Sequence, residues 1–283
     1  MSPLQPVFRF APSPNGRLHL GHAYSALLNE SLARKTGGRL LLRMEDIDTT
    51  RCTPEFAQAC KQDLAWLGMT WEEPVRVQSE HWEDYIAALT SLGRRGMMYP
   101  CFCSRSQIAA ASTATDPEGA PLYPGTCALL SQSEAQKRMD AGEPHGWRLH
   151  MGMAMLRFPG PHTYMRFNPV TMNTETVSAN PARWGDVLLA RKDIPTSYHL
   201  SVTLDDALQG ITHVVRGKDL EAATDLHILL QALLKLPIPL YHHHPVLTEK
   251  TGGLKLSKSK GSQTLASLRD EGLTPKEIRR MLH

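Results

Sequence analysis

The sequence lacks any long apolar run, and no window approaches the roughly 18 consecutive apolar residues that a membrane-spanning helix needs. Its first nine residues, Met1 to Arg9, also lack the basic flank and apolar stretch of an export signal. Cysteine is scarce, with five residues, and an odd number without an export signal argues against a disulfide framework. We therefore expect a cytoplasmic protein with no membrane partner, whose cysteines bind metal or are inert thiols.

A strong net charge is also missing. The formal charge is +3, which is too small to indicate a polyanionic partner by itself. Its distribution is uneven, because residues 249–283 hold eight Lys and Arg against four Asp and Glu. Attraction to phosphate grows with local positive charge, so a phosphate-binding function should depend on this C-terminal stretch.

The hydrophobic patterning predicts an α/β fold. Val7 to Phe10 reads as a strand, residues 20–36 read as a helix closed by Gly37 and Gly38, and residues 39–43 read as a second strand. A strand, a helix and a strand within about 40 residues form one crossover unit of a parallel sheet. Further helical patterns and apolar, strand-like runs lie at 54–68, 79–95 with Ser79 as its cap, 187–189, 214–215 and 218–235.

The apolar periodicity stops near residue 97 and restarts near residue 181, which suggests an insertion in the α/β domain. We expect a Rossmann-like catalytic domain of residues 1–96 and 181–247, with an inserted zinc-binding subdomain of residues 97–180. Residues 248–283 would form a Lys-rich loop and a short helical tail.

Two imidazoles stand where the first predicted strand turns into its helix. His19 and His22 are three residues apart, so they share one face of a helix whose start favours anions. Both could face one phosphate, and Gly21 would let a ligand such as an adenine ring approach the backbone. By themselves, such histidines are more often capping or core residues.

A second cluster lies more than 200 residues later, in Lys-Leu-Ser-Lys-Ser-Lys-Gly at 255–261. Three ammonium groups within six residues could fold over a triphosphate. A solvated basic loop is the alternative, and for most runs of charge it is the correct one.

A third cluster combines Cys101, Cys103 and Cys127 with Tyr123. Three thiolates and one further donor would complete a tetrahedral zinc site, although the first spacing is tight and a phenolate is a rare ligand. Buried inert thiols are the alternative, and His145, His150 or water could replace the tyrosine. The run His242 to His244 has no assigned role, because consecutive strand residues point to alternate faces.

Taken together, His-Leu-Gly-His at 19–22 and Lys-Leu-Ser-Lys-Ser at 255–259 resemble the paired ATP-binding motifs of class I aminoacyl-tRNA synthetases. Residues 9–22 and 42–51 resemble the glutamyl and glutaminyl branch of that family. The resemblance implies that the carboxylate of glutamate attacks the α-phosphorus of ATP, giving glutamyl-adenylate and pyrophosphate. His19 and His22 would act at the α-phosphate, and Lys258, with Lys255, would hold the pyrophosphate. Mg²⁺ would arrive with ATP.

The same resemblance implies a pocket for glutamate. Glu45 would bind the ammonium group of the amino acid, whereas its other interpretation is an exposed acidic turn. A tyrosine and an arginine on later strands of the family map to Tyr198 and Arg216; the tyrosine could instead be a core aromatic. The remaining residues implied are Arg9, Ala11 and Ser13 beside the amino acid, Pro12 and Gly21 beside the nucleotide, and Cys101, Cys103, Tyr123 and Cys127 on one structural zinc ion.

Only 24 residues follow Ser259, so we expect no anticodon-binding domain after the catalytic one. A catalytic domain of this kind with such a zinc pattern resembles the glutamyl-Q tRNA(Asp) synthetases. This implies a monomer that transfers glutamate to the queuosine base of tRNA(Asp), with the basic tail and the zinc insertion facing the RNA. The alternatives are a truncated enzyme charging tRNA(Glu), a noncatalytic tRNA-binding paralogue, and a different nucleotidyl transferase of the same superfold.

Replacing Lys258 tests the role of the lysine motif. Lys258→Ala should lower glutamate-dependent ATP–pyrophosphate exchange by more than about tenfold, because one cation on the transition-state phosphates is lost. Lys276→Ala, in the same basic C-terminal stretch but outside the lysine cluster, is the control. An exchange rate in Lys258→Ala equal to that of the control would refute the assignment.

Overall fold

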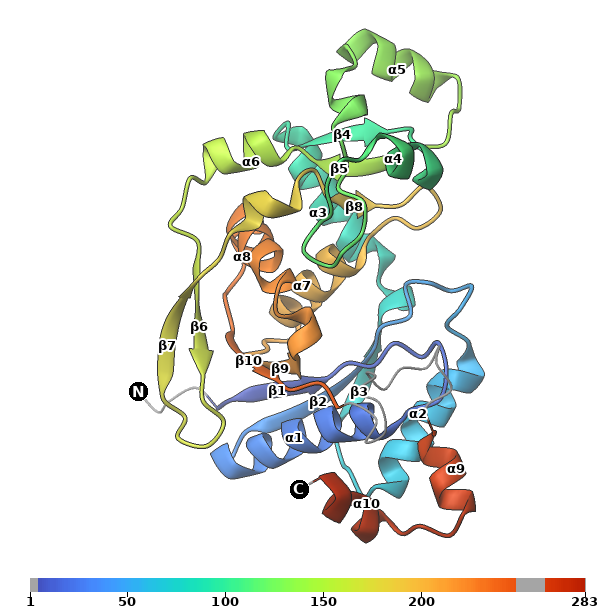
Figure 1. The fold of residues 1–283 in the computed structure, drawn as a ribbon, viewed down its shortest axis with the longest axis vertical. Helices are drawn as coiled ribbons and strands as arrows, with labels where there is room; N and C mark the ends of the chain where they lie inside the picture. The colour runs from blue at the N-terminus through green and yellow to red at the C-terminus, as the bar shows by residue number, and fades with distance from the viewer. Residues whose placement is uncertain (1–4, 248–262, 283) are drawn as a thin grey trace.

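The structure is a computed structural model that describes residues 5–247 and 263–282 (Figure 1). Lys255 and Lys258, which the sequence assigns to pyrophosphate, lie outside the described residues. All other residues that the sequence analysis singles out as site residues are described.

The N-terminal crossover unit forms as the sequence predicts. Strands β1 (Val7–Phe10), β2 (Arg39–Met44) and β3 (Glu72–Val77) make a parallel sheet in the order β1, β2, β3. Helix α1 (Leu20–Thr36) connects the first two strands. Gly37 ends this helix in the left-handed region, at φ 62°, and its N–H bonds back to the last turn.

A second sheet continues the first. Strands β9 (His213–Gly217), β10 (Leu240–His244) and β6 (Thr163–Phe167) are parallel, and β7 (Thr174–Ser178) joins β6 in antiparallel register. Thr212 binds Val7 at the start of β1, where its N–H donates to the Val7 carbonyl at 3.0 Å. Strand β9 thus lies beside β1 (Figure 1). The prediction of an α/β fold with a parallel sheet is confirmed.

The third sheet is antiparallel and consists of β4 (Met98–Cys101), β5 (Gly146–Leu149) and β8 (Leu188–Ala190). The predicted boundary between the insertion and the catalytic domain, at residue 180, does not separate the sheets, because strands before it pair with strands after it. Strand β8 follows that residue yet pairs with β5, and β6 precedes it yet pairs with β10. Helix α5 (Gln132–Asp140) forms the outer tip of this part of the chain (Figure 1).

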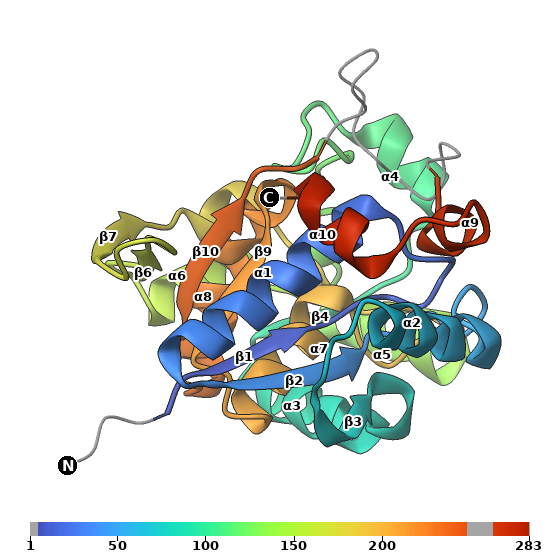
Figure 2. The ribbon, with the colours of Figure 1, turned by 90° about the horizontal axis from the view of Figure 1, so that it is seen from below.

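Helices cover both faces of the parallel strands. Helix α1 lies on one face, and helices α7 (Tyr198–Leu208) and α8 (Ala223–Leu234) lie on the other (Figures 1 and 2). Each layer has its own core: α1 buries Ala23, Ala26 and Leu27 against β2, and α8 buries a leucine-rich face against α3 and α7. The other described helices are α2 (Pro54–Trp66), α3 (Trp82–Arg94), α4 (Arg105–Ala111), α6 (Met151–Arg157), α9 (Leu265–Asp270) and α10 (Pro275–Leu282).

The predicted cap of the helix at 79–95 is wrong. Helix α3 begins at Trp82 with His81 at its cap position. Ser79 lies in a short 3-10 turn, where its N–H and hydroxyl both donate to Asp46 at 2.8 and 2.6 Å. A capping serine accepts from a helix N–H, whereas Ser79 donates to a carboxylate that is 33 positions away in the sequence.

Among the described residues, no helix combines the length and apolar character that crossing a bilayer would require.

Two adjacent aspartates on α7 connect all three strands of the first sheet to the helical layer. Asp206 accepts hydrogen bonds from Arg9 of β1 at 3.0 Å and from Arg43 of β2 at 2.7 Å. Asp205 accepts one from Arg76 of β3 at 2.8 Å. Asp205 and Arg43 are fully buried, so each charge depends on its partners for the stabilisation that water would otherwise supply.

Removing one buried charge tests this connection. Asp205→Asn should lower the free energy of unfolding by about 3–5 kcal/mol, because Arg76 loses its buried counter-ion. The matched control is Asp84→Asn, since Asp84 also pairs with Arg76, at 2.6 Å, but has a side chain that is 40% exposed. The control should cost less than about 1 kcal/mol. Equal losses in urea denaturation would contradict the assignment.

Candidate active site

A cavity of 420 Å³ opens at the carboxyl ends of β1, β2 and β9, where parallel sheets commonly bind ligands. It also receives the first residues of α1 and α7. All ten described residues that the sequence analysis places at glutamate or the nucleotide line it: Arg9, Ala11, Pro12, Ser13, His19, Gly21, His22, Glu45, Tyr198 and Arg216. The structure therefore brings together segments separated by more than 200 positions in the sequence.

His19 and His22 form the cap of α1. His19 Nδ1 accepts from the Gly21 N–H at 3.1 Å, and His22 Nδ1 accepts from the His19 N–H at 3.2 Å. The two rings lie 3.8 Å apart between centroids. A backbone N–H can only donate, so the proton of each neutral ring is on Nε2, which is a donor suited to a phosphate oxygen.

The start of α1 is favourable for an anion in two further respects. Its first turn carries no acidic residue, so nothing opposes the positive end of the helix dipole. Gly21 leaves room for the cap, because a Cβ at this position would lie 2.9 Å from His19 Cε1. Any larger residue would push the His19 ring from its place.

Glu45 follows β2 and is 12% exposed in its side chain. Its Oε1 accepts from Arg43 Nη2 at 2.9 Å, while no described residue donates to Oε2. Burial raises the pKa of the Glu45 carboxyl above its ordinary value, and the Arg43 ion pair opposes this rise. A cationic group in the cavity would favour the ionised carboxylate.

Arg43 is a residue that the sequence analysis missed. Its guanidinium lies between Glu45 and Asp206, and its Nη1 also donates to Gln209 at 3.0 Å. Arg9 is similarly engaged, since its Nε binds Asp206 at 3.0 Å and its Nη1 approaches the Val215 carbonyl at 3.5 Å. Carboxylates of the protein therefore neutralise the charges of both Arg9 and Arg43.

Arg216 differs from both. It is 6% exposed, and no carboxylate of the described residues lies within 4.0 Å of its guanidinium. Its partners are neutral, namely Thr224, His227 and His243. A buried guanidinium without a counter-ion makes the adjoining cavity a receptor for an anion such as a carboxylate.

Tyr198 is the first residue of helix α7, so the expectation that it lies on a strand is wrong. Ser197 caps the helix through its side chain, which accepts from the Leu200 N–H. Burial raises the pKa of Tyr198 to about 12, so its hydroxyl stays protonated at neutral pH and can donate to a ligand.

The histidines of β10 alternate between faces, as the sequence analysis argues. His242 packs against Phe167, and His243 faces Arg216 and Thr224 on the opposite side. His244 reaches the cavity wall and meets Tyr24 of α1 edge to face. Sequence reasoning missed this residue, because nothing local distinguishes it from its neighbours.

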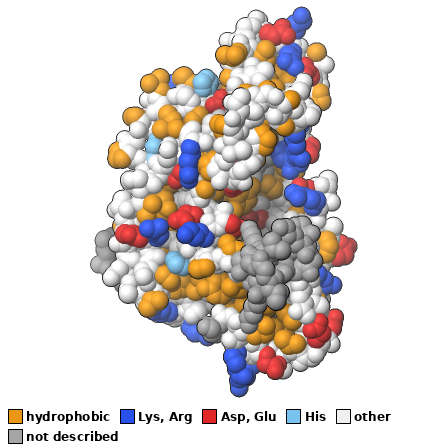
Figure 3. Space-filling view, viewed as in Figure 1, with side chains coloured by type: hydrophobic (Ala, Val, Ile, Leu, Met, Phe, Trp, Pro, Cys, Tyr) orange, Lys and Arg blue, Asp and Glu red, His pale blue; other side chains and the backbone are white. Residues whose placement is uncertain are grey.

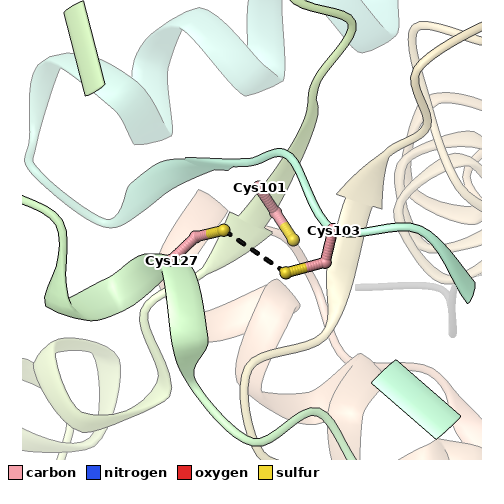
Figure 4. A group of neighbouring side chains, drawn as sticks. All are labelled: Cys101, Cys103 and Cys127. Atoms are coloured by element: carbon pink, nitrogen blue, oxygen red, sulfur yellow. Dashed lines mark hydrogen bonds between the residues drawn. The ribbon is translucent and has the colours of Figure 1, made fainter. Parts of the chain in front are cut away.

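The three predicted cysteine ligands lie together (Figure 4). The sulfur atoms of Cys101, Cys103 and Cys127 are all within 4.8 Å of one another, and Cys103 Sγ is 3.5 Å from Cys127 Sγ. Cys101 is the last residue of β4, and Cys127 lies in a short 3-10 turn (Thr126–Leu129). Such a group can hold a metal ion.

Tyr123 borders this group. Its hydroxyl is 3.8 Å from Cys103 Sγ and accepts from the Cys127 N–H at 2.7 Å. His145 and His150 were the sequence-based alternatives, but neither belongs to the cluster among the described residues. His145 instead contacts the Glu143 carbonyl, and His150 caps α6.

Three cations surround the cysteine cluster. The guanidinium of Arg148 lies 3.7 Å from the centroid of the Tyr123 ring, and that of Arg138 lies 4.1 Å from the Phe102 ring. Lys192 donates to the Phe102 carbonyl at 2.7 Å. Three thiolates around a divalent ion carry excess negative charge, which Arg148 and Lys192 would offset, whereas Arg138 is paired with Glu143.

The other cysteines are outside this cluster. Cys60 is buried in α2. Cys52 lies in the loop before α2, where Thr53 is the cap. Its thiol is 3.5 Å from the Ser13 hydroxyl behind the cavity wall, and burial raises its pKa.

Fold and site together define a class: an α/β domain with a parallel sheet, two histidines at a helix start, and a cavity lined by charged side chains at the ends of the strands. The family model of class I tRNA synthetases of the E and Q type, catalytic domain, matches residues 6–283. A glutamyl-Q tRNA(Asp) synthetase of Rhodobacter capsulatus is 43% identical, over 98% of this chain and 99% of its own length. Another, from Symbiobacterium thermophilum, is 39% identical over 95% of this chain and 83% of its own length.

The chain belongs to the class I tRNA synthetases of the E and Q type, among relatives that are glutamyl-Q tRNA(Asp) synthetases. A glutamate–tRNA ligase 2 of Nitrosococcus oceani is 37% identical, and this chain covers 57% of it. The glutamate–tRNA synthetase structure of Elizabethkingia anophelis superimposes with a TM-score of 0.77 at 25% identity, covering 98% of this chain and 61% of that one.

Glu45 can be tested through the pH dependence of glutamate binding. Its raised pKa means that the carboxylate becomes neutral as pH falls through a value above 4.5, so the KM for glutamate should rise there. Glu45→Gln should raise this KM by more than about tenfold at neutral pH and leave the KM for ATP unchanged. In Glu45→Gln, the KM for glutamate should no longer rise as pH falls through the pKa of the Glu45 carboxyl, because that carboxyl is absent.

The control is Glu55→Gln, on the exposed first turn of α2. Steady-state ATP–pyrophosphate exchange measures both constants. If the KM for glutamate depends on pH in Glu45→Gln as it does in the wild-type protein, the proposed role of this carboxylate is contradicted.

Proposed function

We propose that this chain activates glutamate with ATP and transfers it to the queuosine base of tRNA(Asp). One observation carries the proposal: Glu45 and Arg216, of opposite charge, face the same cavity as the paired histidines at the start of α1. Glutamate presents an ammonium group and two carboxylates, and the cavity offers one group of matching chemistry for each end of that molecule.

The amino acid would be oriented by charge. Arg216 would bind the side-chain carboxylate, because its guanidinium has no carboxylate partner among the described residues. Glu45 would bind the ammonium through Oε2, and Tyr198 would donate its hydroxyl to the substrate. The α-carboxylate would then face the nucleotide, which is the orientation that the reaction requires.

The nucleotide would lie at the start of α1. The Nε2–H groups of His19 and His22 would donate to oxygens of the α-phosphate, and the helix dipole would add to the positive potential. Pro12 and Gly21 would border the nucleotide. Lys258 and Lys255 would hold the pyrophosphate, and Mg²⁺ would enter as the counter-ion of the ATP phosphates.

Activation then needs no covalent nucleophile from the protein. A carboxylate oxygen of glutamate attacks the α-phosphorus, the bond to the β-phosphate oxygen breaks, and pyrophosphate leaves. In the transfer step a hydroxyl of queuosine attacks the carbonyl carbon of the adenylate, loses its proton, and AMP leaves. The protein contributes position and charge stabilisation to both steps.

The choice of RNA rests on the relatives. Six curated relatives, at 36–43% identity, are called glutamyl-Q tRNA(Asp) synthetases, and two at 36–37% are called glutamate–tRNA ligase 2. The cysteine-bearing region with α5 and the C-terminal helices are the proposed RNA-facing parts. On the described face of Figure 3, basic and acidic side chains are interspersed without one continuous basic patch.

The cysteine cluster would hold one structural zinc ion. Cys101, Cys103 and Cys127 would supply thiolates, and the Tyr123 hydroxyl, 3.8 Å from Cys103 Sγ, would be the fourth donor. A zinc ion bound there would crosslink β4 to the turn at Cys127 and so fix the shape of this part of the molecule.

The decisive experiment measures transfer of radiolabelled glutamate to purified tRNAs. We expect label on tRNA(Asp) that contains queuosine and none on tRNA(Asp) without it. Equal labelling of both tRNAs would refute transfer to queuosine. Label on tRNA(Glu) alone would identify a conventional charging enzyme, and the absence of glutamate-dependent pyrophosphate exchange would identify a noncatalytic protein.

Metal analysis tests the zinc site. The purified protein should contain about one zinc per chain, and Cys103→Ser should lose it, because three protein donors hold zinc far less tightly than four. His145→Gln is the matched control and should retain the metal, since His145 is outside the cluster. Finding no zinc in the wild-type protein, or equal zinc in both variants, would contradict this assignment.

A further inference from the structure

The guanidinium of Arg216 is held by three neutral groups from two secondary-structure elements. Its Nη1 lies 3.2 Å from His227 Nδ1, and its Nη2 donates to Thr224 Oγ1 at 2.9 Å, both on α8. Its Nε donates to His243 Nε2 on β10 at 3.4 Å. Thr224 is fully buried and His227 is 2% exposed, so this shell belongs to the interior of the protein.

The direction of these hydrogen bonds fixes the protonation of the shell. A guanidinium can only donate, so His227 must accept through Nδ1 and carry its proton on Nε2. That Nε2 lies 3.3 Å from His199 Nδ1, which must accept in turn. His243 Nε2 accepts from Arg216 Nε and so carries no proton, which makes the Thr224 hydroxyl the donor in its 3.0 Å contact with this nitrogen. The three imidazoles are therefore all neutral.

The surroundings keep them neutral. Burial and the nearby Arg216 charge lower the pKa of His199 to about 4 and that of His227 well below its ordinary value. A second proton on His227 or His199 would place an N–H donor against the N–H donor that the ring nitrogen now accepts from. The shell thus positions Arg216 without cancelling any of its charge.

A guanidinium has five N–H groups, and three of them are used by this shell. One N–H on each terminal nitrogen is left, which is the number that a carboxylate accepts in a bidentate pair. Arg9 and Arg43, which line or support the same cavity, are instead held by carboxylates. Of these three arginines, Arg216 alone has only neutral hydrogen-bond partners, so its charge is the one that a ligand can pair with.

We propose that His227, Thr224 and His243 are positioning residues that make Arg216 selective for the side-chain carboxylate of glutamate over the amide of glutamine. The inference rests on the proposed function and adds to it the residues that determine the choice of glutamate over glutamine. A neutral amide would leave the buried charge unpaired, whereas a carboxylate neutralises it. An acidic residue in the shell would neutralise Arg216 from within and remove the preference.

A pair of variants that differ by one charge tests this. His227→Asn places an amide oxygen near the position of Nδ1, whereas His227→Asp places a carboxylate there. ATP–pyrophosphate exchange gives kcat and KM for glutamate and for glutamine. His227→Asp should raise the KM for glutamate by at least about tenfold and lower the preference for glutamate over glutamine by a similar factor. His227→Asn should stay within about threefold of the wild type.

The KM for ATP is the internal control, and it should not change in either variant. Equal glutamate constants in His227→Asp and His227→Asn would overturn the inference. Failure of the proposed function would look different, since the wild-type protein would then show no glutamate-dependent exchange at all.

A second pair keeps the test decisive if His227→Asp does not fold. Thr224→Val removes the acceptor at constant shape, and Thr224→Ser retains it. Thr224→Val should raise the KM for glutamate about threefold to tenfold with kcat little affected. A KM in Thr224→Val equal to that in Thr224→Ser would overturn the inference.

Discussion

The structure depends on the pairing of Asp205 and Asp206 with one arginine from each strand of the first sheet. Arg9, Arg43 and Arg76 come from β1, β2 and β3, and all three reach the same turn of α7. Arg43 and Asp205 are fully buried. Moving helix α7 away from the strands would therefore leave an unpaired charge in the interior, which is strongly destabilising. The pairing holds the helix that begins with Tyr198 against the strands that end at the cavity.

The cavity gains its chemistry from a contrast between two kinds of buried arginine. Arg9 and Arg43 are neutralised by Asp206 and Glu45 and so serve the architecture. Arg216 is held by a hydroxyl and imidazoles, so its charge is directed to a ligand. Glu45 stands between these roles, with one oxygen on Arg43 and the other accepting nothing from the described residues. The same type of side chain thus supports the fold in one place and, in the proposed function, would bind substrate in another.

Sequence patterns predicted what local chemistry determines. Strand β1 and helix α1 have the predicted bounds, because prolines end the strand and Gly37 ends the helix in a conformation that favours glycine. Residue type and spacing singled out the three cysteines, with inert thiols as the alternative, and the structure places their sulfur atoms together. The cap at Ser79 failed because Asp46 takes its hydrogen bonds, and the link of Arg43 to Asp206 spans 163 positions with no local signal. The neutral shell of Arg216 escaped prediction for the same reason.

The most direct test of the account is a crystal structure with a nonhydrolysable glutamyl-adenylate analogue. The account predicts the side-chain carboxylate on Arg216, the ammonium within hydrogen-bonding distance of Glu45, and the phosphoryl oxygens beside His19 and His22. An analogue with its carboxylate remote from Arg216, or with the phosphoryl group away from the start of α1, would contradict it.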